Sequence, residues 1–203
     1  MQKKISKSST PDKNEAIKNQ IQLQQKANNP LSINQNSGIF NQQQTLIRIK
    51  QEYELCIQDN DLMQIGCNFG LENNNIFKWR ITMIGPRNTP YENGLFTINA
   101  IFPQDYPLHG PEFKFVNKIY HLNVDFKNNS GHICTNNLNE WMRSGKVNGQ
   151  TFYTVKQALF EIFCLFFCYY KEPEFYDARE RIFSLKEFES EARKWTKDFA
   201  SMN

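Results

Sequence analysis

The sequence lacks an apolar run long enough to cross a bilayer. The longest one, residues 158–170, is interrupted by Glu161, so it predicts a buried helix and no membrane span. The first residues are polar, without the apolar region of a secretory signal, and the first arginine is Arg48, which disfavours a mitochondrial presequence. We therefore expect a cytoplasmic and/or nuclear protein with free thiols.

Net charge is also low. The formal charge is +3, and residues 1–44 alone carry +4, from six lysines against two acidic residues. Residues 45–203 are therefore nearly neutral, at −1, and contain no basic stripe. This pattern excludes nucleic acid as an expected partner.

Residues 1–44 are poor in apolar side chains and contain nine Gln and seven Asn. Such a segment buries too little apolar surface to offset the entropy lost on ordering. We expect a disordered tail over residues 1–44 and one folded domain over residues 45–203. The tail is interpreted either as a docking arm that folds on a partner or as a compositional bias without a role.

The N-terminal half of the domain predicts a helix followed by strands. Thr45 is the expected cap of a helix through residue 58, and residues 59–75 suggest loop and turn. One face of that helix carries Leu46, Ile49, Tyr53 and Cys56. Strand-like runs at 77–84, 94–102 and 112–120 are close enough to form an antiparallel meander. Alternate residues of the second run form one apolar face: Phe96, Ile98, Ala100 and Phe102.

The C-terminal half predicts an exposed loop at residues 144–149 and two helices. Thr151 or Thr154 caps the first helix, and the second covers about residues 177–200. The inward face of the second should hold Phe188, Ala192, Trp195 and Phe199. Cys164 and Cys168 lie four residues apart, but without a His or acidic pair nearby they favour core packing, and we expect no metal site.

Cys134 has a different setting from the other four cysteines. It lies in a polar segment rich in Gly, Asn and Ser, eleven residues after Asn123, and no Lys or Arg is within five residues of it. A thiolate can attack an acyl group, and a side-chain amide can donate to the resulting oxyanion, without a metal. The alternative interpretation is a small core cysteine and a turn-forming asparagine.

Several short motifs occur in one order along the chain. They are FKW at 77–79 with IGP at 84–86, TPYENGLF at 89–96, FPQDYP at 102–107, IYHLNV at 119–124, GHIC at 131–134 and ARKWT at 192–196. In this order and spacing they resemble the ubiquitin-conjugating enzymes, over about residues 45–203. The resemblance implies an α+β fold with an N-terminal helix, a four-stranded antiparallel meander, an active-site loop and C-terminal helices.

The resemblance also implies a reaction. Cys134 would accept ubiquitin as a thioester from an activating enzyme and pass it to a substrate lysine or a ligase. Asn123 would stabilise the oxyanion, and His121 and Tyr120 would support the loop without acting as a base. No cofactor is expected, because ATP is used by the activating enzyme.

The expected partners are ubiquitin or a ubiquitin-like protein, an activating enzyme and, for some transfers, a ligase. By the same resemblance, Arg48 and Lys50 of the first helix would contact the activating enzyme. Leu108, Met142 and Arg143 would lie on the ligase-facing surface.

The chain departs from the family pattern near this site. Leu122 replaces the proline between the His and the Asn, so the backbone that aims Asn123 is less constrained. Gly110 replaces the first proline of a Pro-Pro pair, and Trp141 comes one residue early. About eight extra loop residues follow Trp141.

Three functions are therefore compatible with the sequence. The first is an active ubiquitin-conjugating enzyme, favoured because both Cys134 and Asn123 are present. The second is an inactive relative that serves as a binding or scaffold domain, and the third is a conjugating enzyme for another ubiquitin-like modifier. An acid that orients the incoming lysine is expected beyond the apolar helix, where neither Glu172 nor Glu174 can be assigned.

Overall fold

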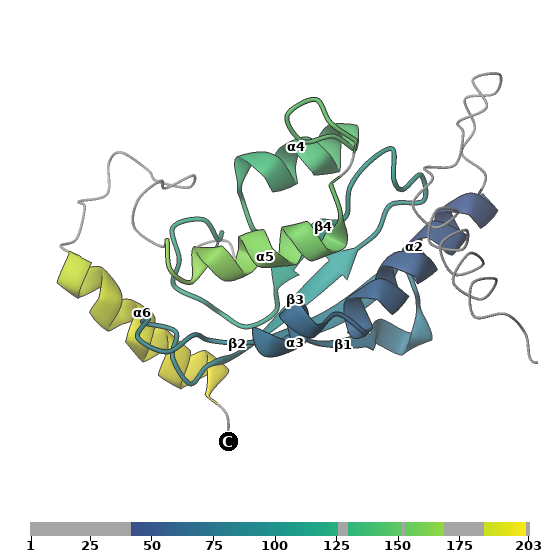
Figure 1. The fold of residues 1–203 in the computed structure, drawn as a ribbon. Helices are drawn as coiled ribbons and strands as arrows, with labels where there is room; N and C mark the ends of the chain where they lie inside the picture. Colours follow the sequence, from purple (N-terminus) through teal and green to yellow (C-terminus); the bar gives the residue numbers. More distant parts are fainter. Residues whose placement is uncertain (1–41, 126–129, 152, 169–184, 202–203) are drawn as a thin grey trace, which may run out of the picture. The chain divides into compact units, whose positions relative to one another are not determined.

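The computed structural model describes residues 42–125, 130–151, 153–168 and 185–201 (Figure 1). The elements follow in the order α2 Gln42–Ile57, α3 Asn60–Gln64, β1 Asn68–Leu71, a 3₁₀ turn Glu72–Asn74, β2 Lys78–Ile84, β3 Leu95–Ile101, β4 Glu112–Phe115, α4 Asn136–Ser144, α5 Val155–Leu165 and α6 Leu185–Ala200. The predicted disordered tail lies outside these residues, apart from its last three.

The first helix begins earlier than predicted. Residues 42–44 already belong to α2, because glutamine is a good helix former, so the tail boundary at residue 44 is three residues late. Thr45 is not the cap. It is buried within the helix, and its hydroxyl donates to the Tyr106 carbonyl at 2.9 Å.

The four strands pair in chain order as an antiparallel meander, which confirms the predicted sheet. Alternate side chains of β2 and β3 are buried and form the inner face: Trp79, Ile81, Met83, Phe96, Ile98 and Ala100. The last strand ends at Phe115, earlier than predicted. Beyond it, the Val116 amide still donates to the Thr97 carbonyl at 2.8 Å, but the Thr97 amide donates to the Asn117 side chain at 2.6 Å, so a side chain replaces one of the two backbone bonds of the next pair.

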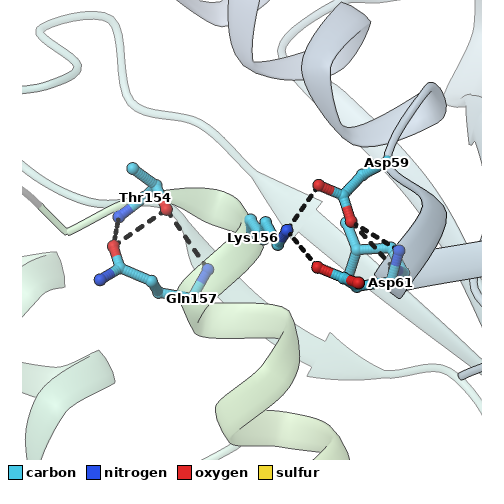
Figure 2. A network of polar contacts seen from close by, with 6 residues as sticks. Asp59, Asp61, Thr154, Lys156 and Gln157 are labelled. Carbon is cyan, nitrogen blue, oxygen red and sulfur yellow. Dashed lines mark hydrogen bonds and ion pairs between the residues drawn. The ribbon is translucent and has the colours of Figure 1, made fainter.

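Residues 59–75 are not the loop that the sequence predicts, since they contain α3 and β1. The Asp59 carboxylate caps α3 by accepting from the Asp61 and Leu62 amides, both at 3.0 Å. Figure 2 shows Lys156 of α5 reaching the carboxylates of Asp59 and Asp61, at 2.6 and 2.9 Å. The edge strand β1 was missed because it is short, contains Gly70 and is only half-buried, so it lacks a clear alternation.

Helix α5 starts at the second of the two predicted caps. Thr154 and Gln157 form a reciprocal capping box, with the Gln157 amide donating to the Thr154 hydroxyl at 3.3 Å and the Thr154 amide to the Gln157 side chain at 2.8 Å (Figure 2). The inward face is fully buried and comprises Val155, Ala158, Leu159 and Ile162. The prediction that Cys164 and Cys168 pack in the core is wrong, because α5 ends at Leu165 and both cysteines are exposed there.

Helix α6 buries Phe188 and Ala192 as predicted, but Phe199 is 42% exposed and Trp195 is half-buried. The inner face continues instead through Thr196 and Ala200, which follow Ala192 at intervals of four residues. The first part of the predicted helix, residues 177–184, lies outside the described residues.

The loop after α4 is less exposed than its turn residues suggest. Gly145 ends α4 in the left-handed region, at φ 64°, and is buried, as is Val147. The Glu140 carboxylate accepts the Asn148 amide hydrogen at 2.9 Å, which ties the loop back to α4. The burial of Gly145 and Val147 and this hydrogen bond across eight residues do not follow from the turn-forming residue types alone.

Two departures from the family pattern compensate for each other. The Gly110 amide donates to the Trp141 carbonyl at 2.8 Å, and a Cβ at position 110 would lie 2.6 Å from the Trp141 ring. The early tryptophan therefore occupies the space that a side chain at position 110 would need.

Gly110→Ala should lower the free energy of unfolding by about 1–3 kcal/mol, because a buried ring and its backbone must shift. Gly70→Ala is the control, since the nearest atom to its added Cβ is at 3.8 Å. Urea unfolding checks the pair. Equal midpoints for Gly110→Ala and the unsubstituted chain would contradict the tight fit.

Candidate active site

His121 ties the predicted active-site loop to the end of α5. Its Nδ1 accepts the Asn123 amide hydrogen at 2.9 Å, and its Nε2 lies 3.0 Å from the Leu165 carbonyl. A carbonyl only accepts, so the ring is neutral with its proton on Nε2. Burial lowers the pKa of His121 to about 4. Both nitrogens are therefore engaged, which fits the predicted supporting role and not a general base.

Tyr120 is held from two sides. Its carbonyl accepts from the Tyr91 hydroxyl at 2.9 Å. Its ring packs against Phe188 and Trp195 of α6, at centroid distances of 5.1 and 5.6 Å. The loop that leads to Asn123 is thus anchored through the Tyr120 backbone to the turn between β2 and β3, and through the Tyr120 ring to α6.

Asn123 and Cys134, eleven residues apart in the sequence, lie side by side in the structure. The Cys134 amide donates to the Asn123 carbonyl at 2.9 Å, and the Asn123 Nδ2 donates back to the Cys134 carbonyl at 3.0 Å. The next residues, Val124 and Ile133, form an antiparallel bridge. Asn123 is only 7% exposed, and its side-chain amide holds the cysteine backbone in place. To stabilise an oxyanion, the same amide must reach the acyl oxygen once a thioester has formed.

Sequence reasoning missed helix α4, which begins directly after the cysteine. Thr135 caps it by accepting the Leu138 amide hydrogen at 3.2 Å. The Asn139 side-chain amide then lies 3.0 Å from the Cys134 Sγ. The available signal was a threonine followed by Leu138 and Trp141 at helical spacing.

Glu161 was also missed, because the sequence presents it only as a polar interruption of an apolar helix. Its carboxylate accepts from the Thr135 hydroxyl, from Asn137 Nδ2 at 2.9 Å and from the Tyr153 hydroxyl at 2.5 Å. Burial, together with Glu161, raises the pKa of Tyr153, which therefore remains a donor. Glu161 of α5 thus holds the start of α4, next to Cys134.

The two residues expected to contact an activating enzyme differ in environment. Arg48 lies 2.6 Å from Glu52, a buried carboxylate that also accepts from the Tyr106 hydroxyl at 3.1 Å. Lys50 is exposed. Arg48 therefore has a structural contact, and Lys50 is open to solvent.

The three residues expected on a ligase-facing surface come from two segments that meet. Leu108 is 47% exposed, Arg143 is exposed near the end of α4, and Met142 is half-buried. A Cβ on Gly145 would lie 2.5 Å from the Leu108 carbonyl oxygen, so the loop of Leu108 packs against the end of α4.

Three further expectations concern a metal site, a membrane span and an acid near the lysine entry. Within the part of the chain that the structure describes, no three His, Cys, Asp or Glu side chains gather to hold a metal ion. No helix among those residues is long and apolar enough to cross a membrane. Glu172 and Glu174 lie outside the described residues.

The burial of His121 predicts a dependence of stability on pH. Its pKa is lower in the fold, about 4, than in an unfolded chain, about 6.5, so the unfolded state binds the proton first as the pH falls. Stability present above about pH 6.5 should fall by roughly 3 kcal/mol as the pH drops towards 4. Urea unfolding across this range measures the loss.

His121→Asn should remove this part of the acid slope. A direct readout is the ring's NMR titration in the unsubstituted protein. A His121 ring that takes up its proton at its ordinary pH would contradict the assigned neutral, buried state.

Comparison with known proteins finds a matching family model and several similar proteins. A family model described as ubiquitin-conjugating enzyme matches residues 48–196. The chain is 42% identical over 93 residues to a protein named probable ubiquitin-conjugating enzyme E2 31 of Arabidopsis thaliana, covering 46% of this chain and 56% of that protein. It is 45% identical over 71 residues to Protein PEROXIN-4 of the same plant, covering 34% and 44%.

Among solved structures, the fold is similar to the E2 domain of a Toxoplasma gondii ubiquitin conjugating enzyme. The TM-score is 0.61 at 30% identity, over 77% of this chain and 99% of that domain. A putative ubiquitin conjugating enzyme from Plasmodium yoelii gives the same score and identity, over 78% and 96%. The chain spans about half the length of the curated relatives it matches.

Proposed function

Because the chain belongs to the ubiquitin-conjugating enzyme family, we propose that it accepts ubiquitin from an activating enzyme as a thioester on Cys134 and transfers it to a substrate lysine or a ligase. The observation that carries this proposal is the setting of Cys134. Cys134 is partly exposed just before α4, and its backbone amide and its backbone carbonyl are both hydrogen-bonded to Asn123.

The other cysteines are poorer candidates. Cys56 and Cys67 are buried, and burial raises the pKa of both thiols to about 12. Partial burial also raises the pKa of Cys164, and both Cys164 and Cys168 are exposed at the end of α5. Cys134 combines access with an ordered polar environment, which a reusable nucleophile needs.

Two steps follow from a thioester mechanism. In loading, the Cys134 thiolate attacks the carbonyl carbon of the activating enzyme's thioester, a new C–S bond forms, and the old C–S bond breaks with its electron pair leaving on the activating enzyme's sulfur. In discharge, a lysine amine attacks, a C–N bond forms, the C–S bond to Cys134 breaks, and the amine proton passes to solvent. His121 takes no part in proton transfer, since both its ring nitrogens are engaged.

Both steps pass through a tetrahedral oxyanion. Asn123 donates a side-chain hydrogen bond to the cysteine backbone, and one oxyanion donor is typically worth about 3–4 kcal/mol in the barrier. Asn123 is buried and its Nδ2 donates to the Cys134 carbonyl, so it is held beside the cysteine and must donate to the acyl oxygen when the thioester is attacked.

The remaining parts of the proposal concern partners. Arg48 and Lys50 of α2 would meet the activating enzyme, and Leu108, Met142 and Arg143 would meet a ligase. This chain itself needs no cofactor, since ATP serves the activating enzyme. It acts in the cytoplasm and/or the nucleus.

The matches to PEROXIN-4 and to a protein named ubiquitin-conjugating enzyme E2 pex4 favour a narrower version of this function, a specialised conjugating enzyme.

The test is a loading assay with the purified chain, ATP, and a panel of activating enzymes each paired with its modifier. We expect one modifier to form an adduct on a non-reducing gel that disappears with reductant. An adduct with a modifier other than ubiquitin would select the alternative conjugating enzyme. No adduct with any pair would select the binding or scaffold domain.

A further inference from the structure

Cys134 and Asn139 occupy two helix positions whose side chains meet. With Thr135 as the cap of α4, Cys134 is the residue before the cap and Asn139 is the fourth residue of the helix. Side chains at these two positions commonly pack together as an apolar pair that fixes the entry of the chain into the helix. Here the pair is polar, with the Asn139 Nδ2 at 3.0 Å from the Cys134 Sγ.

The backbone on which Asn139 sits is held from several sides. The backbone amide of Asn139 donates to the Thr135 carbonyl at 3.0 Å, and its backbone carbonyl accepts from Arg143 Nε at 3.2 Å. The cap itself is bound to α5, because the Thr135 hydroxyl donates to Glu161. The fold therefore positions the backbone from which the side-chain amide of Asn139 extends, independently of any acyl group on the sulfur.

The chemistry of this contact depends on the charge of the sulfur. A neutral thiol is a weak hydrogen-bond acceptor, whereas a thiolate is a charged one, and bonds to charged groups are roughly twice as strong. The N–H of Asn139 therefore binds more tightly as charge builds on Sγ. The N-terminal end of α4 acts in the same direction, because helix N-termini favour negative charge.

We propose that Asn139 is a second catalytic amide, which donates to Sγ of Cys134 and stabilises the thiolate. This rests on the proposed function, in which that thiolate attacks in loading and departs in discharge. When the lysine amine displaces it, the electron pair of the breaking C–S bond comes to rest on Sγ, facing the Asn139 amide. Asn123 serves the carbonyl side of the reaction, and Asn139 the sulfur side.

A hydrogen bond donated to a thiolate favours the charged form over the neutral thiol and makes that thiolate intrinsically less nucleophilic. Removing Asn139 should therefore slow reactions of Cys134 near neutral pH, where ionisation is limiting. At high pH, where the thiol is ionised anyway, the variant should react as fast or faster. A general loosening of the loop would change both rates in one direction.

The experiment is alkylation of Cys134 by iodoacetamide, followed by mass spectrometry of its peptide. The parent protein carries Cys164→Ser and Cys168→Ser, because both of those thiols are exposed and would react. Asn139→Ala should slow alkylation near neutral pH by roughly three- to tenfold, and the slowing should vanish at high pH. Asn139→Asp keeps the shape but places a carboxylate at the sulfur, so it should slow the reaction further.

Asn136→Ala is the matched control. It removes an exposed asparagine from the first turn of the same helix and should leave the rate unchanged. Equal rates for Asn139→Ala and its parent near neutral pH, or an equal slowing at both pH values, would overturn the proposal.

The last readout is discharge of preloaded protein to free lysine, which Asn139→Ala should slow by roughly three- to tenfold. An unchanged discharge rate would show that Asn139 does not contribute to catalysis. Alkylation needs no ubiquitin and no activating enzyme, so a parent protein that fails to load would reject the proposed function while the donor role of Asn139 is still decided.

Discussion

Cys134→Ala should abolish loading altogether, because no other cysteine among the described residues combines solvent access with a donor at its sulfur. Cys134→Ser should either fail to load or give an ester that survives reductant, since the oxygen forms a stronger acyl bond than sulfur does. A non-reducing gel after incubation with the activating enzyme, ATP and ubiquitin measures both results.

Cys164→Ala is the control for this experiment. Cys164 is exposed at the end of α5, so its replacement should leave loading intact. Adduct that persists in Cys134→Ala and disappears in Cys164→Ala would move the nucleophile to the end of α5 and remove the basis of the proposed site.

Asn123→Ala should slow discharge to free lysine by about 100- to 1,000-fold, the effect typical of removing an oxyanion donor. Loading should suffer much less, because a thiol is both a better nucleophile and a better leaving group than an amine, so the exchange depends less on one donor. Single-turnover discharge of preloaded protein, compared with the loading rate, measures this difference.

The structure adds a second way for this substitution to act. Asn123 donates to the Cys134 carbonyl, so its loss also frees the backbone of the cysteine. A purely structural effect would slow loading and discharge alike and would lower the unfolding midpoint. Equal losses in both steps, or a discharge rate that does not change, would therefore reject the oxyanion role and favour the scaffold alternative.

Much of the fold follows from local patterns in the sequence. The alternation of Phe96, Ile98 and Ala100 predicts a strand with one buried face, and all three are buried in β3. The sequence predicts Thr151 or Thr154 as the cap of the apolar helix, and α5 starts after Thr154. Such features depend on neighbours within a few residues, and those neighbours are visible in the sequence.

Part of the site could also be predicted. The motifs around Asn123 and Cys134 point to one loop region, and the structure joins the two residues by reciprocal hydrogen bonds. What the sequence missed was the helix that starts directly after the cysteine. Without α4, nothing indicates that Asn139 meets the thiol or that Glu161, from another helix, holds its start.

The sequence by itself therefore determined the first helix, the strands β2 to β4, the helices α5 and α6 and the family, and it indicated Asn123 and Cys134 as one candidate site. Only the tertiary structure decided which side chains face solvent, as at Cys164 and Phe199, and why Gly110 accompanies an early Trp141. The reason is physical. Periodicity and capping act over a few residues, whereas exposure, steric fit and polar partners depend on segments that are distant in the chain and meet only when it folds.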